Sequence, residues 1–217
     1  MKKLAFLLIV LFGIFPIVNG QNSEGHIKYK ITASTDNPDL EPMLGMMDGS
    51  LLDLYYSDLK SRAEFKMGMM STTTTIIDMG SRKMLTLISM GKSALVGTIP
   101  DDETMKDEQS EDYKISLTND TKKIIGFTAK KAVITTKDGH VADFWYTEDI
   151  SAKVSDHQMV KKHGIPGVLL EMTIEESDVK MSFTAISFES KLPKNNKLFE
   201  MEIPEGYTVT SIDDIKK

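Results

Sequence analysis

The stretch from Val168 to Ala185, VLLEMTIEESDVKMSFTA, carries the pattern that decides the fold. Every second residue of 168–174 is apolar, and a glutamate and a threonine stand among the residues between them. The same alternation returns over 179–185, after four polar residues. Alternation with period two is typical of a strand with one buried face. The two runs therefore predict an antiparallel hairpin joined by a polar turn.

Other segments alternate in the same way, among them residues 65–69, 84–90 and 141–146. Asp138-Gly139 fits the tight turn of a hairpin, because both residues tolerate a positive φ. Long helical segments do not separate these runs, which disfavours a sheet built from βαβ units. The pattern predicts roughly nine to eleven strands, and an open sheet of that size tends to curl or close on itself. We therefore predict a mainly β fold with minor α content, a curled antiparallel sheet or half-open β-barrel.

Two short helices are predicted beside the sheet. Asn37-Pro38 is typical of a helix start, and apolar residues follow at helical spacing as far as Met47, with Gly49 as a stop. Ser155 begins the second segment, which resembles a capping box, and Gly164 ends it. Isolated helices of this length are marginal in water, so we expect both to pack on the sheet.

The N-terminus is typical of an export signal. Lys2 and Lys3 precede a nearly unbroken apolar run from Leu4 to Val18, and small residues lead to Gly20. A membrane anchor is the alternative, but the run is shorter than the roughly 20 residues that a spanning helix needs. We predict that residues 1–20 are a signal peptide, cleaved after Gly20, and that the mature protein is periplasmic or secreted. No second apolar run reaches membrane length, so the mature chain is not expected to span a membrane.

Composition limits the remaining chain, residues 21–217, to a single domain. The 217-residue sequence is 41% hydrophobic and 27% charged, which supports a real core. It contains no cysteine, which excludes disulfides, thiolate metal sites and a cysteine nucleophile. The net charge of -6 leaves no basic patch for a phosphate backbone, so we expect no nucleic-acid partner.

Methionine is the most unusual feature of the composition. The chain has 15 methionines, and the region from Met43 to Met90 is especially rich in them. Three interpretations are open: ordinary core packing, an adaptable apolar groove of polarizable thioethers, and a Cu(I) site, which soft thioether ligands favour. Alternate spacing along strands buries every second methionine instead of bringing them to one point, which disfavours copper. No histidine lies among them.

No motif in the sequence indicates catalysis or a resident metal. His157 and His163 are the closest pair of histidines, but their spacing does not place them on one helix face. Paired carboxylates fall in polar turns, where they lack the desolvation that a catalytic acid needs. Ser57 and Lys60 match the short S-x-x-K pattern, yet its companion motifs are missing and the segment is typical of a hairpin turn. We therefore predict a protein that is not an enzyme, with no catalytic residues, no metal and no cofactor.

The single tryptophan lies in an aromatic triplet, Phe144-Trp145-Tyr146. Successive residues of a strand point to opposite faces. Either Trp145 or its two neighbours therefore line the interior of the curled sheet. Filling an ordinary core is the alternative role for these rings.

Five stretches along the chain form a recognisable series: Thr74–Asp78, Lys83–Leu87, Lys123–Lys131, Asp143–Ile150 and Phe199–Tyr207. In this order they resemble a family of secreted Bacteroidetes proteins of unknown function. That family is similar to the lipoprotein-carrier and lipoprotein-receptor (LolA/LolB-like) half-barrels of the bacterial periplasm. The resemblance covers most of the mature chain. It implies a half-open antiparallel barrel around an apolar cavity, with short helices as a lid and no catalytic residues.

These observations lead to one functional hypothesis and two alternatives. We expect an exported periplasmic binding protein that holds a lipid, or the acyl chain of a lipoprotein, in the half-barrel cavity. The residues expected to line that cavity are Met43, Met47, Met67, Met69, Met84 and Trp145. The first alternative is a structural or protein-interaction module of the cell envelope, with a filled core and no small ligand. The second alternative is a soft-metal binder that holds Cu(I) through methionines.

Overall fold

The structure of the chain is a computed structural model. It describes residues 24–47, 49–68, 70–99, 113–137, 139, 141–150, 165–176, 178–194 and 197–212. These residues form twelve strands and one short helix, α2 (Glu41–Gly45). The strands are β1 (Glu24–Thr35), β2 (Leu51–Ser57), β3 (Lys60–Met67), β4 (Ser71–Asp78), β5 (Lys83–Ile88), β6 (Ser93–Thr98), β7 (Tyr113–Ile124), β8 (Phe127–Thr136), β9 (Val141–Thr147), β10 (Val168–Glu176), β11 (Val179–Glu189) and β12 (Thr208–Ser211).

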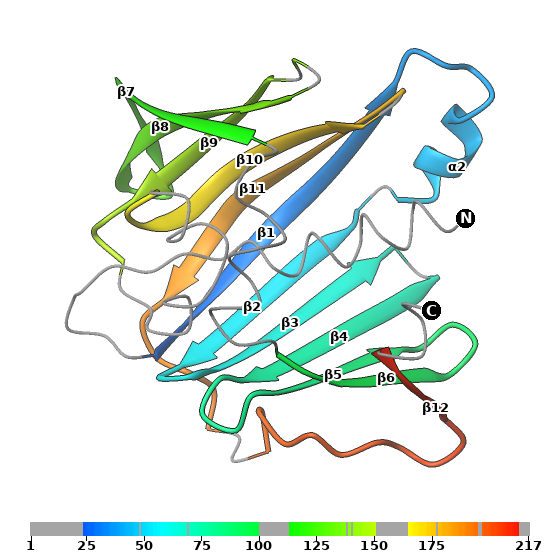
Figure 1. Cartoon of the computed structure of the whole chain (residues 1–217). Helices are drawn as coiled ribbons and strands as arrows, with labels where there is room; N and C mark the ends of the chain where they lie inside the picture. Colours follow the sequence, from blue (N-terminus) through cyan, green and yellow to red (C-terminus); the bar gives the residue numbers. More distant parts are fainter. Residues whose placement is uncertain are drawn as a thin grey trace.

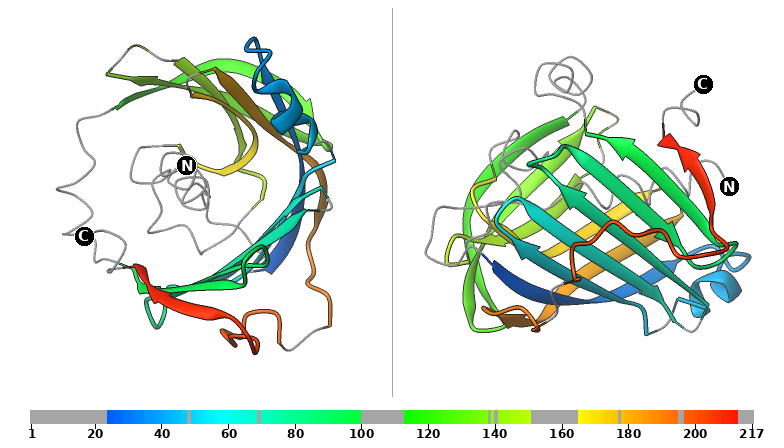
Figure 2. Two further views of the ribbon diagram at one scale, coloured as in Figure 1. Left: turned by 90° about the vertical axis from the view of Figure 1, so that its right-hand side faces the viewer. Right: turned by 90° about the horizontal axis from the view of Figure 1, so that it is seen from below.

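The strands form one continuous sheet (Figure 1). Its order is β12-β6-β5-β4-β3-β2-β1-β11-β10-β9-β8-β7, and each pair is antiparallel except the parallel pair of β12 and β6. The sheet curls strongly, but its edge strands β7 and β12 do not meet, so it is not closed into a barrel (Figure 2). The predicted fold class, a curled antiparallel sheet with minor helix, is confirmed. The sequence pattern does not predict β12, because its four residues are too few to show alternation.

The hairpins that organise the sheet follow the predicted turns. β10 and β11 form the predicted antiparallel hairpin, with Glu176 opposite Val179 at its turn. Gly139 has a φ of +83° and lies in the predicted turn between β8 and β9. β10 departs from strict alternation at its start, where a bulge shifts its pairing with β9 between Leu169 and Glu171. The bulge explains why successive leucines at this end of the strand are buried.

The segment 197–204 identifies the outer face of the sheet, and we call it the strap. It crosses the outside of the curled sheet (Figure 2). Arg62 of β3 donates a hydrogen bond from Nη1 to the carbonyl oxygen of Leu198 in the strap, at 3.3 Å. Arg62 and the cross-strand partners that share its face therefore lie on the convex face of the sheet. The residues that alternate with them lie on the concave face.

The concave face carries the main hydrophobic core. Ile27, Tyr29 and Ile31 of β1 point to this face, and each is at most 2% exposed. The register places Leu54 and Leu52 of β2 opposite Ile27 and Tyr29, and directly opposite residues share a face. The same face continues through β3, β9, β10 and β11 with Ala63, Phe65, Phe144, Tyr146, Met172, Met181, Phe183 and Ala185.

The convex face of β1–β3 is charged and closely paired. Asp53 is 2% exposed and accepts hydrogen bonds from His26 Nε2 at 2.8 Å and Lys66 Nζ at 2.9 Å. Lys28 Nζ lies 3.5 Å from the same carboxylate. The ring of His26 stacks on Tyr55, with their centroids 4.2 Å apart. These partners provide the pairing without which a buried carboxylate would be strongly unfavourable.

The convex face of β4–β6 is apolar instead. Ile76, Leu85 and Ala94 occupy it, and each is at most 2% exposed. The strap crosses this part of the sheet, and its own Leu198 is buried as well. These residues are separate from the concave core cluster. The strap therefore creates a second, smaller apolar layer on the outside of the sheet.

The first predicted helix is shorter than expected. Regular helix runs only over Glu41–Gly45, with Leu40 as the N-cap residue. Asn37 does fold the chain locally, because its side-chain oxygen accepts a hydrogen bond from the Asp39 amide at 3.1 Å. This bond closes an Asx turn, so the chain makes a turn before the helix begins. The predicted helix start at Asn37-Pro38 is therefore wrong.

Three predictions fall outside the described residues. They are the signal peptide of residues 1–20 with its cleavage after Gly20, the helix from Ser155 to Gly164, and the placement of Met69. All three stay predictions. In the described ranges, no helix has both the length and the apolar character that crossing a membrane requires.

Candidate ligand-binding site

The concave face presents a continuous surface of apolar and aromatic side chains. Its rings come from Tyr29, Tyr56, Phe65, Phe144, Tyr146 and Phe183. They lie on β1, β2, β3, β9 and β11, so strands that are distant in the sequence combine to form the surface. Charge is present at one border of this face, where Lys130 of β8 lies opposite Tyr146 and pairs with Glu148 at 2.7 Å. Such a surface suits hydrocarbon and offers few of the groups that a polar ligand requires.

Two tyrosine hydroxyls interrupt the apolar surface. Tyr29 donates a hydrogen bond from its hydroxyl to the carbonyl oxygen of Leu169 at 2.8 Å, across the intervening strand β11. Tyr56 is 2% exposed, and its hydroxyl has no hydrogen-bond partner in the described structure. Burial raises the pKa of both phenols above their ordinary value of 10.0. Both hydroxyls therefore stay protonated at neutral pH and can donate a hydrogen bond.

Gly25 allows the ring of Tyr56 to lie close against β1. The two residues are opposite each other in the register of β1 and β2. A Cβ atom at Gly25 would lie only 2.4 Å from the hydroxyl oxygen of Tyr56. Any side chain at this position must therefore displace the ring or the strand.

Toward β4 and β5 the concave face carries hydroxyl groups. Thr73 and Thr75 of β4 point to this face and are buried. The hydroxyls of Thr75 and Thr86 form a hydrogen bond with each other at 3.0 Å. Because these two hydroxyls satisfy one another, this part of the surface is less polar than its threonine content indicates.

The structure does not bring the predicted methionines together at one place. Met47 and Met67 are half-buried and pack against the concave core. Met43 of α2 is 40% exposed, and Met69 lies outside the described residues. Met84 shares the concave face with Ile77 and Thr86 by register, but it lies outside the main core cluster and beside a groove at the strap. Of the predicted methionines that the structure describes, Met47 and Met67 are the two that pack against the concave core.

Trp145, the sixth predicted lining residue, lies on the convex face. Its cross-strand partners are Lys131 of β8 and Glu171 of β10. Lys122 Nζ lies 4.2 Å from the centroid of the indole ring, and Lys131 Nζ lies 5.9 Å from it. Lys122 also forms an ion pair with Glu171 at 2.6 Å. The two neighbours of Trp145 in the aromatic triplet take the concave face instead.

Sequence reasoning missed the tyrosines of the concave surface, although a signal for them is present. Tyr29 lies between Lys28 and Lys30 in the sequence. An aromatic residue that alternates with charged residues is expected on the buried face of a strand. Methionine frequency is a weaker guide, because a flexible thioether is tolerated equally on a turn or a short helix. Aromatic residues at alternate strand positions indicate this surface better.

The groove beside the strap is apolar and has a volume of about 460 Å³. Met84, Leu85 and Val96 line it from β5 and β6, and Met201 and Ile203 line it from the strap. It lies where the strap meets the sheet, away from the aromatic concave surface. We therefore treat it as a feature of the strap and not as part of the candidate site.

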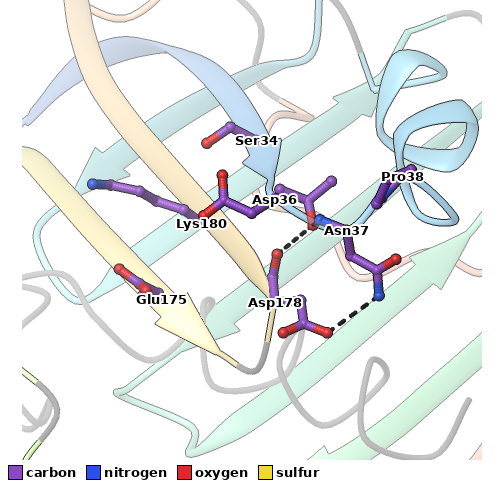
Figure 3. A pocket seen from close by; sticks show the side chains of 8 residues that line it. Ser34, Asp36, Asn37, Pro38, Glu175, Asp178 and Lys180 are labelled. Atoms are coloured by element: carbon purple, nitrogen blue, oxygen red, sulfur yellow. Dashed lines mark hydrogen bonds between the residues drawn. The ribbon is translucent and has the colours of Figure 1, made fainter.

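A polar pocket of about 730 Å³ lies at the rim of the sheet, where β1 leads into α2 and β10 turns into β11 (Figure 3). Asn37 donates a hydrogen bond from Nδ2 to Oδ2 of Asp178 at 3.3 Å, and the Thr35 hydroxyl donates to the Asp178 carbonyl oxygen. Asp36 and Glu175 add acidic side chains. No three His, Asp or Glu side chains in the described residues are arranged to hold a metal ion. The hydrogen bonds join two turns of the rim, and the polar lining does not suit hydrocarbon.

A comparison with protein families relates this fold to known proteins. The family described as "N-glycanase peptide, N-terminal domain" matches residues 60–204. The chain belongs to this family. The match runs from the start of β3 into the strap, so it includes most of the curled sheet and its convex cover. No curated protein sequence matches the chain.

Two solved structures show a similar fold. The structure of PNGF-II in C2 space group has 16% sequence identity and a TM-score of 0.51, and the match covers 89% of this chain and 31% of that chain. This chain therefore spans about a third of the length of PNGF-II. An uncharacterized conserved protein from Thermus thermophilus has 10% identity and a TM-score of 0.52, and the match covers 97% of this chain and 99% of that chain. The resemblance to lipoprotein carriers is untested by these findings and stays a prediction.

Proposed function

We propose that this protein is an exported, non-catalytic binding domain that holds an apolar ligand, such as a lipid or acyl chain, against the concave face of its sheet. The observation that carries the proposal is the continuous surface of apolar and aromatic side chains built by β1–β3 and β9–β11. Burial of ligand hydrocarbon would drive binding, with a contribution of roughly 0.8 kcal/mol per CH₂ group.

The open sheet supports this proposal because strands do not enclose the concave face on all sides, although its aromatic side chains are at most 5% exposed and a ligand must displace what covers them. β7 and β12 form separate edges, whereas a closed barrel of similar size would be accessible only at its two ends. Met47 and Met67 border the surface, and their flexible thioethers can adapt to chains of different shape.

The family relationship supports a role without catalysis. The family is described as the N-terminal domain of an N-glycanase, and the matching part of PNGF-II is about a third of that longer chain. A domain in that position can bind a ligand or partner without carrying the catalytic groups. We extend this role to the present protein.

Equilibrium binding of a fluorescent fatty acid to the mature protein, residues 21–217, tests the proposal. We expect saturable binding with a micromolar or lower Kd, and displacement by unlabelled acyl chains that improves about fourfold per added CH₂ group. Phe144→Leu on the concave face should weaken binding several-fold. Leu117→Ala, at a 50% exposed residue of β7, serves as the matched control and should bind as the wild type does. Absence of saturable binding at micromolar concentrations, both for the fatty acid and for neutral apolar ligands, would remove the proposal.

One observation favours a second candidate, a protein-interaction module of the cell envelope. β7 is 12 residues long and forms an open edge of the described sheet. Unpaired backbone groups along such an edge can pair with a strand of another protein. This candidate predicts that a stable protein partner co-purifies with the mature chain, and that the fluorescent fatty acid does not bind.

A further inference from the structure

The hydroxyl of Tyr56 is a buried polar group without a partner on the apolar concave surface. The residue is 2% exposed and belongs to the core cluster, yet its hydroxyl neither donates nor accepts a hydrogen bond within the described structure. Leaving a buried hydroxyl unpaired is unfavourable, so folded proteins nearly always satisfy such groups. An acceptor atom of a bound ligand would satisfy this one.

The nearest parts of the sheet hold the Tyr56 ring without satisfying its hydroxyl. The cross-strand partners of Tyr56 are Gly25 on β1 and Ser61 on β3. Gly25 has no side chain, and a Cβ atom there would lie 2.4 Å from the hydroxyl oxygen, so the ring rests against the backbone of β1. The position of the ring is therefore fixed by close packing, while the hydroxyl is buried and has no hydrogen-bond partner in the described structure.

Tyr29 is a second buried tyrosine on the same face, and its hydroxyl does have a hydrogen-bond partner. Its hydroxyl is equally buried, but it donates to the carbonyl oxygen of Leu169 at 2.8 Å. The fold thus supplies an acceptor for one of the two phenols and none for the other. This difference singles out Tyr56 as the phenol that can bind a ligand.

The surroundings of Tyr56 favour a neutral acceptor over a carboxylate. Leu54 of the same strand and Ile27 and Ala63 of the neighbouring strands share its face, and none of them carries a charge. The cations nearest in register, Lys60 and Arg62, flank Ser61 on β3 and lie on the convex face, where they pair with Asp78 and Glu64. A carboxylate buried among these apolar residues would have no cation to pair with, which is strongly unfavourable. A carbonyl oxygen needs only one donor, and the phenol provides it.

We infer that Tyr56 anchors the ligand, and that the ligand is a neutral acyl ester or amide whose carbonyl oxygen accepts a hydrogen bond from the Tyr56 hydroxyl. This inference rests on the proposed function and adds the class of head group. Tyr56 lies next to the β2–β3 turn, and Met67 lies at the opposite end of β3. The head group therefore binds near the turn, and the hydrocarbon chain extends along the concave face toward Met47 and Met67.

Displacement of a neutral fluorescent probe, N-phenyl-1-naphthylamine, from the mature protein tests the inference. Three competitors of similar length are compared at pH 8: methyl laurate, the laurate anion and tetradecane. We expect methyl laurate to bind about tenfold more tightly than tetradecane, as one buried hydrogen bond allows, and more tightly than laurate. Tyr56→Phe should abolish the preference for the ester while tetradecane binding stays within about twofold.

Tyr29→Phe is the matched control, because it also deletes a phenol hydroxyl from the concave face. It should lower the thermal stability, since the Leu169 carbonyl loses its donor, and it should keep the preference for the ester. Tyr56→Phe should melt at the same temperature as the wild type or higher, because it removes a hydroxyl that makes no hydrogen bond.

The outcomes separate this inference from the proposed function. If the wild type binds tetradecane and the ester equally, or if Tyr56→Phe keeps the preference for the ester, the inference is overturned while the proposed function stands. If the wild type displaces no probe with any of the three competitors and binds no fluorescent fatty acid, the proposed function fails, and the inference fails with it.

Discussion

The convex face of the sheet is built in two different ways. On β1–β3 it is a network of charges around Asp53, and the side chains of Lys28 and Lys66 reach solvent beside it. On β4–β6 it is a set of apolar side chains that the strap covers. One sheet therefore has a polar exterior in one half and a second apolar layer in the other.

This difference shows that the burial of a strand's side chains depends on which segments cover each face of the sheet, and not only on the curvature of the sheet. β1 alternates between buried and more exposed residues over most of its length. In β4, by contrast, the five consecutive residues from Thr73 to Ile77 are all buried. A strand covered on both faces is uniformly buried, as in the interior of a sandwich. The strap is the cover that makes β4 such a strand.

The family match includes all of the apolar half and only part of the charged half. It begins at Lys60, the first residue of β3, and it ends at Pro204 in the strap. The apolar convex half and the strap lie inside the match, whereas the charged half is divided by it: Lys66 lies inside, and Asp53 and His26 lie before it.

The largest effect is expected from breaking the apolar half. Leu85→Ala removes a side chain that is 2% exposed beneath the strap, and a large-to-small change in a packed layer costs about 3 kcal/mol of unfolding free energy. Urea denaturation followed by circular dichroism measures the loss. Leu117→Ala, at a 50% exposed leucine of β7, is the control and should cost less than about 0.5 kcal/mol. Equal effects of the two substitutions would show that the strap does not seal this layer.

A smaller effect is expected from breaking the charged half. Asp53→Asn keeps the shape of the side chain but removes the charge that His26, Lys28 and Lys66 surround. Because the two lysines are partly exposed and can be hydrated instead, we expect a loss of about 2 kcal/mol at pH 7, below the cost of orphaning a fully buried ion. Urea denaturation at low and high salt measures it. A loss that does not shrink with salt would contradict an electrostatic origin.

The same variant gives a pH dependence with a defined sign. Burial opposes ionisation of Asp53, but hydrogen bonds from Lys66 and His26 outweigh it and hold the pKa of Asp53 below its ordinary value of 3.8. A carboxyl whose pKa is lower in the folded state stabilises the fold above its unfolded pKa, and this contribution disappears as the pH falls through the folded pKa. Asp53→Asn should therefore differ most from wild type near neutral pH and converge toward it below about pH 4. A difference in the free energy of unfolding that stays constant across this pH range would contradict a lowered pKa of Asp53.

The sequence predicts the residues of the concave face better than those of the convex face. Alternation over β10 and β11 gives the hairpin and its buried face directly, because a strand with one solvated face shows period two. The burial of Ile76 and Leu85 cannot be predicted in this way, because the strap that covers them lies more than 100 residues later in the chain. A pattern within one strand carries no information on such a distant cover.

The candidate site is predictable in kind and not in detail. The triplet around Trp145 shows that aromatic rings line the interior, but alternation alone leaves open which of the two sets faces inward. The cross-strand partners of Trp145 show which set faces inward. They are Lys131 and Glu171, so the indole ring shares its face with charged groups and its two neighbours face the interior. Cross-strand register comes from pairing between strands, and no single stretch of sequence contains it. The unpaired hydroxyl of Tyr56 is hidden from sequence reasoning for the same reason.

The smallest effect is expected on the convex face of β7–β9, a third region of the exterior, where Lys122 covers Trp145. Lys122 Nζ lies 4.2 Å from the centre of the ring and pairs with Glu171 at 2.6 Å, but its side chain is 34% exposed. Lys122→Ala should lower the free energy of unfolding by less than about 1 kcal/mol, since cation–π contacts and ion pairs at exposed sites are weak.

Trp145 is the only tryptophan in the chain, so its fluorescence reports the loss of the Lys122 contact directly. We expect a red-shifted emission and stronger acrylamide quenching in Lys122→Ala, and a smaller change in Lys122→Met, whose unbranched side chain still covers the ring. Lys114→Ala, at an exposed residue of β7, should leave the spectrum unchanged, and an equally unchanged spectrum in Lys122→Ala would mean that the lysine does not shield the ring in solution.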